Sequence, residues 1–193
     1  MTHEAEPQTY SAFVGNRLLT NGALPDVLTV AKRHYDVSNV PVLLFEDWSG
    51  RQVDFNLSGS SQDVLRRADP TPQKAGRGRP RLGVQSREVS LLPRHWEWLE
   101  ENPAGISAAI RRLVDEARKR ETGADKARRL RDATSRFMWA MAGNLPHFEE
   151  TARALYAKDI AAMEALVVEW PADIRDHVLR LARQAERLEA HAA

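Results

Sequence analysis

Cysteine is absent from the 193 residues of this chain, which excludes disulfides, thiol catalysis and zinc fingers. The sequence also lacks any apolar run that approaches the roughly 20 residues a membrane helix needs. Residues 1–7 show neither the basic nor the apolar region of a signal peptide. These absences fit a reducing compartment, and we expect a cytoplasmic protein with no membrane partner.

The chain as a whole carries almost no excess of one charge, because 28 basic side chains are set against 27 acidic ones. This balance hides a local excess. Between Arg66 and His95, eight basic and two acidic residues give a net charge of +6. A basic segment of this kind is typical of nucleic-acid binding, and a solvated basic linker is the alternative interpretation.

Motifs for catalysis and for ligand binding are missing as well. The six histidines are scattered, with no HExxH pair and no cluster at metal-ligand spacing. The glycines near Arg77 lack the Lys-Ser/Thr pair and the preceding strand of a phosphate-binding loop. We therefore expect no metal, no cofactor and no enzymatic activity.

One enzymatic alternative stays open, that of a magnesium-dependent nuclease. Glu46 and Asp47 end one predicted strand, and Asp54 lies on its neighbour, so their carboxylates could share a metal ion. The segment 47–50, Asp-Trp-Ser-Gly, is also explained as an ordinary turn.

Hydrophobic patterning predicts an α+β fold in several segments. Residues 9–58 are expected to form a small α+β domain of two β-hairpins around a helix. Apolar residues flank the turn signal Gly15-Asn16, and a continuous apolar run at 42–45 predicts a buried strand. Residues 59–85, rich in Gly, Ser, Pro, Gln and Arg, predict a basic flexible linker with one brief helix at 62–68.

The remaining segments are predicted to be mostly helical. Residues 121–193 carry apolar stripes at helical spacing and predict a C-terminal helical bundle. Whether this bundle packs on the first segment is left open. Residues 86–120 predict a strand, in which Val89 and Leu91 alternate with serine, followed by two helices. The apolar stripe of the second helix consists of Ile106, Ile110, Leu113, Val114 and Ala117.

This strand-helix-helix order resembles the ribbon-helix-helix family of bacterial repressors and antitoxins. The resemblance implies a homodimer, because two chains of that family pair their single strands into a ribbon that enters the major groove of DNA. It also implies a phosphate at the N-terminus of the second helix. The residues it assigns to DNA contact are Ser86, Glu88, Ser90 and Arg94, with Gly105, Ile106 and Ser107 at the phosphate. A register shifted by one residue would instead point Arg87, Val89 and Leu91 outward.

The residues just before this module resemble a minor-groove arm. Arg77-Gly78-Arg79-Pro80 resembles the core of an AT-hook, and the run that continues through Arg81 resembles the arms of some recombinases. Glycine lets the backbone sink into a narrow groove, proline keeps it extended, and arginines follow the negative potential of A·T tracts. We expect Arg77, Arg79 and Arg81 to enter the minor groove.

Nearly the whole chain resembles an uncharacterised bacterial family, the domain of unknown function numbered 2239. The resemblance rests on segments 42–57, 76–96, 142–146 and 170–175, and it supplies no catalytic or binding residues. From the residues themselves we expect a non-enzymatic, dimeric DNA-binding protein that acts as a transcriptional regulator or a nucleoid-type factor. The alternatives are an antitoxin-like adaptor whose ribbon only dimerises, and the nuclease.

Overall fold

The computed structural model describes residues 8–38, 40–68 and 86–190. The chain divides into two compact units, one formed by residues 1–70 and 123–193 and the other by residues 71–122. We call them the sheet unit and the two-helix unit, and each is described by itself. In the described residues, no helix has both the length and the apolar character needed to cross a membrane.

The sheet unit contains an antiparallel sheet of four strands. They are β1 (Tyr10–Val14), β2 (Arg17–Gly22), β3 (Leu43–Glu46) and β4 (Arg51–Val53), in the order β2-β1-β3-β4. Gly15 sits in the β1–β2 turn with φ +53°, a conformation that glycine adopts at little cost. The sheet confirms the two predicted hairpins and the predicted strand at 42–45.

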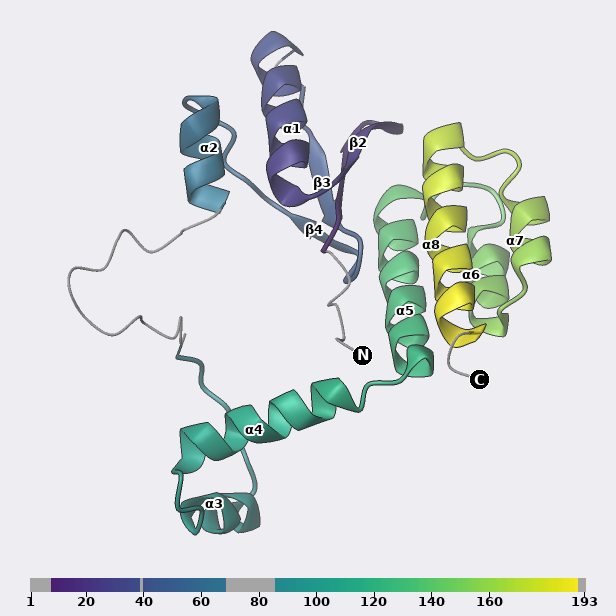
Figure 1. Cartoon of the computed structure of the whole chain (residues 1–193). Helices are drawn as coiled ribbons and strands as arrows, with labels where there is room; N and C mark the ends of the chain where they lie inside the picture. The colour runs from purple at the N-terminus through teal and green to yellow at the C-terminus, as the bar shows by residue number, and fades with distance from the viewer. Residues whose placement is uncertain (1–7, 39, 69–85, 191–193) are drawn as a thin grey trace. The chain divides into compact units, whose positions relative to one another are not determined.

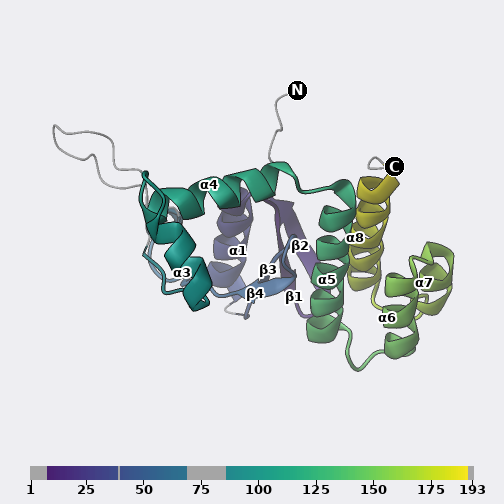
Figure 2. The same ribbon diagram turned by 90° about the horizontal axis from the view of Figure 1, so that it is seen from below.

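Helices cover both faces of this sheet (Figures 1 and 2). Because strand side chains alternate between faces, Tyr10 and Ala12 of β1 point to one layer, and Ser11 and Phe13 point to the other. Tyr10 and Ala12 pack in a core with α1 (Leu24–Ser38) and α2 (Ser61–Ala68). The helix α2 agrees with the brief helix predicted at 62–68.

The opposite face packs on the C-terminal helices. These are α5 (Gly123–Met141), α6 (Phe148–Ala157), α7 (Ile160–Leu166) and α8 (Ala172–Ala190). Phe13 and Phe45 of the sheet share one core with Phe137 of α5 and with Ile174 and Val178 of α8. The first and last segments of the chain therefore pack together, which answers the question that the sequence left open.

The two-helix unit contains α3 (Pro93–Glu100) and α4 (Ile106–Lys119) in its described residues. Pro93 occupies the first turn of α3, where its missing N–H costs no hydrogen bond. Both helices were predicted. The strand expected before them is not formed, because residues 86–92 have no regular secondary structure in this chain. A strand needs a ladder partner, and the ribbon would take its partner from a second chain.

Candidate functional site

The predicted DNA-contact residues fall in three places. Those of the arm, Arg77, Gly78, Arg79, Pro80 and Arg81, lie outside the described residues. Those of the predicted ribbon, Ser86, Glu88 and Ser90, are exposed, and so is Arg94 in the first turn of α3. Val89 is 57% exposed, so in the single chain both sides of the segment face solvent and neither register is distinguished.

The third place is the N-terminus of α4, where the backbone leaves amide groups available. Gly105 precedes the helix with φ +81°, and no side chain caps it. The carbonyl of Gly105 accepts from Ala108 N at 3.1 Å and Ala109 N at 3.0 Å, so the N–H groups of Ile106 and Ser107 precede the first intrahelical bonds. Amides and the helix dipole together favour an anion at such an end.

The apolar side chains of the two-helix unit are mostly uncovered. Among its described residues only Leu99 and Ala109 are buried, at 4% and 1% exposure. Ile106 and Ile110 are half-buried, whereas Leu113 and Val114, one turn further along the same stripe, are 41% and 51% exposed. The described part of this unit therefore presents an apolar face that its own described residues leave exposed.

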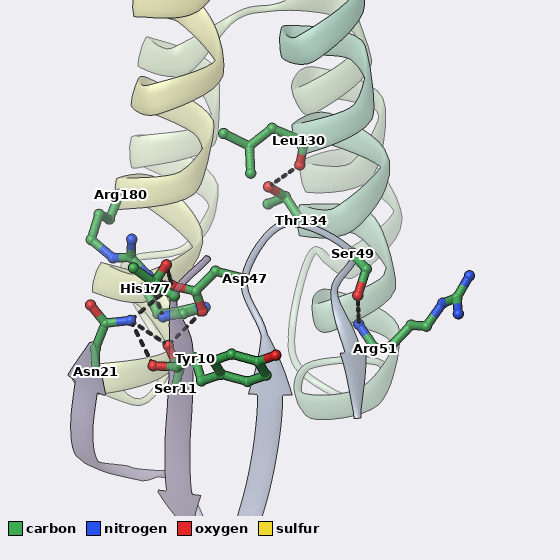
Figure 3. Close-up of polar contacts among 11 residues, drawn as sticks. Tyr10, Ser11, Asn21, Asp47, Ser49, Arg51, Leu130, Thr134, His177 and Arg180 are labelled. Atoms are coloured by element: carbon green, nitrogen blue, oxygen red, sulfur yellow. Dashed lines mark hydrogen bonds and ion pairs between the residues drawn. The ribbon is translucent and has the colours of Figure 1, made fainter. Parts of the chain in front are cut away.

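A second candidate, inside the sheet unit, is a buried polar network centred on Asp47, directly after β3. The Asp47 carboxylate is 3% exposed and accepts from the Ser11 hydroxyl at 2.7 Å and the Asn21 amide at 2.8 Å. It also accepts from Thr9 Oγ1 at 2.8 Å and from Arg180 Nη2 of α8 at 3.1 Å. Figure 3 shows Ser11 of β1, Asn21 of β2 and Arg180 of α8 converging on Asp47 at the start of the β3–β4 turn.

His177 lies beside this carboxylate, with Nε2 4.0 Å from Asp47 Oδ1. Its Nδ1 is 3.1 Å from Arg180 Nη2. Since a guanidinium can only donate, Nδ1 accepts, and the ring proton lies on Nε2, which faces Asp47. Burial lowers the pKa of His177 to about 4, the Asp47 carboxylate opposes this shift, and the charge of Arg180 reinforces it. The imidazole is therefore neutral at pH 7.

The geometry of the network suits a structural role, in which it holds neighbouring elements together, and does not suit nucleophilic catalysis. A nucleophilic serine needs to donate to the histidine that activates it, but Ser11 donates to Asp47 and is fully buried. Burial by itself would raise the pKa of Asp47, but the hydrogen bond from Ser11 and the charge of Arg180 hold it below its usual value. The anionic carboxylate thus ties the β3–β4 turn to β1, β2 and α8.

The carboxylates of the predicted magnesium site do not share a metal-binding arrangement. Glu46 accepts from the Ser49 hydroxyl within the turn, Asp47 points into the network, and Asp54 is exposed. In the described residues, no three His, Cys, Asp or Glu side chains are grouped so that they could hold a metal ion. Residues 47–50 form the turn that was the other interpretation of this segment.

Sequence reasoning missed the network around Asp47 as a whole. Asn21 lies on the edge strand β2, and His177 and Arg180 lie on α8. No motif spacing in the sequence links the strand to the helix. The signal available in the sequence is the apolar stripe of α8, where His177 stands among Ile174, Val178 and Leu181.

Comparison with known proteins places most of the chain in one family. The family model described as "Uncharacterized protein conserved in bacteria (DUF2239)" matches residues 9–182. None of the curated proteins and none of the solved structures matches the chain.

Proposed function

The chain belongs to this uncharacterised bacterial family, DUF2239, and for it we propose the function of a non-enzymatic, dimeric DNA-binding protein that acts as a transcriptional regulator. The observation that carries the proposal is that a basic segment and the two-helix unit follow each other directly in the sequence. A segment of net charge +6 leads directly into a two-helix unit with an uncovered apolar face and an uncapped helix N-terminus.

The uncovered face supports the dimer. Exposed apolar side chains on two amphipathic helices bury their surface when a second copy packs against them. Residues 86–92 have no strand partner among the described residues, and pairing with the same segment of a second copy would satisfy their backbone groups. The proposed ribbon therefore places two copies of Ser86, Glu88 and Ser90 side by side.

The charges and amides support the DNA contacts. Arg77, Arg79 and Arg81 follow the minor groove, where A·T tracts concentrate negative potential. The Ile106 and Ser107 amides hold a backbone phosphate, and Arg94 adds charge beside the groove. Phosphate contacts of this kind are largely sequence-independent, so most of the affinity depends on salt concentration.

The test is fluorescence anisotropy of the full chain with an A·T-rich and a G·C-rich duplex, titrated at several salt concentrations without magnesium. We expect submicromolar binding at low salt, a steep salt dependence and preference for the A·T-rich duplex. Arg79→Ala should weaken binding to both duplexes and reduce the slope of log K against log salt by about one unit for each arm that engages DNA. An unchanged slope would remove the arm from the proposal.

The uncovered apolar face also favours a second function, that of an antitoxin-like adaptor whose ribbon only dimerises. The same titration separates the two, since a stable dimer that binds neither duplex at low salt supports the adaptor. Repeating it with magnesium tests the nuclease alternative, which requires cleavage that is lost in Asp54→Ala.

A further inference from the structure

A cavity of about 330 Å³ lies in the sheet unit among the four C-terminal helices. Each of α5, α6, α7 and α8 contributes to its wall, and we call it the four-helix cavity. Its apolar wall consists of Leu155, Ile160 and Ala182, and its charged lining includes Arg131, Lys158, Glu186 and Glu189. A volume of this size is at the lower end of the range found for small-molecule sites.

Two cations converge on one carboxylate at the edge of this cavity. Arg131 Nη1 of α5 donates to Glu189 Oε2 at 3.0 Å, and Lys158 Nζ donates to Glu189 Oε1 at 2.6 Å. The hydrogen bond from Lys158 and the bond and charge from Arg131 hold the pKa of Glu189 below its usual value. Glu189 thus shows how a carboxylate is bound between these two side chains.

Arg131 has donors left for a second carboxylate. Its side chain is 10% exposed, and the guanidinium carries five N–H donors, of which Glu189 takes one among the hydrogen bonds of the described residues. Lys158 is 54% exposed at its side chain and can turn toward a ligand. Arg131 and Lys158 outnumber Glu189 at this end of the cavity, and Glu186 brings the four charged side chains of the lining to a net charge of zero.

We propose that the four-helix cavity binds a small organic monocarboxylate. Its carboxylate is held by Arg131 and Lys158, and its hydrocarbon part lies against Leu155, Ile160 and Ala182. The apolar wall favours a ligand with several carbon atoms over inorganic anions. Glu186, exposed at the same cavity, repels a second negative charge and so disfavours dicarboxylates and phosphates.

In this proposal Glu189 competes with the ligand for Arg131 and Lys158. Removing the charge of Glu189 should therefore strengthen ligand binding. We choose hexanoate as the probe, and we compare hexane-1,6-dioate, a dianion, and hexylamine, a cation of similar length. Titration of the full chain by calorimetry should show hexanoate binding more tightly than either. In Glu189→Gln, Arg131 and Lys158 lose their counter-charge, so the Kd for hexanoate should fall about tenfold.

Two further variants test whether hexanoate binds in the four-helix cavity. Glu164→Gln removes a different carboxylate, one that accepts from Arg183 at 2.6 Å and does not line the cavity, so its Kd should equal that of the wild type. Ile160→Trp fills the cavity and should abolish binding, also in the Glu189→Gln background. Methyl signals of Leu155 and Ile160 should shift with hexanoate in NMR spectra, whereas those of Val27, in the α1 core, should not.

Several results would overturn the proposal. They are no hexanoate binding below about 10 mM in either the wild type or Glu189→Gln, equal affinity for the dianion or the amine, or binding that survives Ile160→Trp. None of these readouts involves DNA, so the site can fail or hold independently of the proposed function.

Discussion

Asp47 and Arg180 are 133 positions apart in the sequence, and their side chains meet in the interior of the sheet unit. A buried carboxylate is stable only when donors replace the water it has lost. Thr9, Ser11, Asn21 and Arg180 supply those donors to Asp47. A second proton on His177 would lie on Nδ1, which faces the Arg180 guanidinium, itself a donor, at 3.1 Å.

The neutral His177 makes stability depend on pH. Its pKa is about 4 in the native protein and about 6.5 when unfolded. Between these values the unfolded chain binds a proton that the native state does not, so the free energy of unfolding decreases as pH falls from 6.5 toward 4. The slope from this group is at most about 1.4 kcal/mol per pH unit. Urea unfolding at pH 7, 6 and 5 measures it.

Asp47 does not contribute to that window, because its pKa is lowered from 3.8 and its stabilisation is lost only at lower pH. In His177→Gln the loss of stability between pH 6.5 and 5 should therefore shrink. His147→Asn is the matched control, since His147 is exposed and its φ of +58° suits asparagine. An unchanged slope in His177→Gln would show that His177 takes up its proton over the same pH range in the native and unfolded states.

This network could not be predicted from the sequence. Asp47 follows a strand and begins an Asp-Trp-Ser-Gly turn, a sufficient local reason for an aspartate. Its partners come from three other elements, and hydrogen-bond geometry between distant elements has no periodicity to detect. The candidate DNA-contact residues were identified because motif spacing is local, and their role stays a prediction.

At the scale of elements, the β3–β4 turn packs on α5 with no room for a side chain. Gly50 has φ +64°, and a Cβ there would lie 2.0 Å from the carbonyl oxygen of Ala133. Gly15, in the β1–β2 turn, has φ +53° with open space around it. Both substitutions to alanine cost about 1 kcal/mol for the left-handed backbone, and Gly50→Ala adds about 1–3 kcal/mol of overpacking.

Urea unfolding of Gly50→Ala and Gly15→Ala should therefore give a clear difference, with Gly50→Ala the less stable. The backbone term is common to both variants, so the difference isolates the packing of the turn on α5. Equal losses of stability would mean that the turn moves away from α5 at little cost.

Most elements were predictable because their signals are local. The Gly15-Asn16 turn, the apolar run at 42–45 and the stripes of the C-terminal helices identify their elements by periodicity. The strand at 86–92 is the exception, since its alternation of Val89 and Leu91 is present but its ladder partner is not in the described chain. The packing of the first segment on the last depends on long-range contacts such as that of Phe13 with Phe137.

For the whole molecule, the uncovered stripe of α4 predicts an obligate contact between two copies. Leu113 and Val114 lie on it, exposed in the single chain, and their burial in a dimer would remove apolar surface from water. The wild-type chain should therefore elute as a dimer in size-exclusion chromatography with light scattering. A monomer at all concentrations would contradict the ribbon, because one strand cannot form it.

Val114→Glu should dissociate this dimer, since it places a charge in the apolar contact. Arg112→Gln lowers the net charge by the same one unit at an exposed position of α4 and should leave the dimer intact. Circular dichroism should show that both variants keep their helices.

The Val114→Glu monomer also tests whether both arms of a dimer contact DNA. It carries half the basic segments of the dimer, so the salt slope of its DNA binding in anisotropy should fall to about half. A monomer with the full slope would place DNA binding on a surface that does not need the second copy.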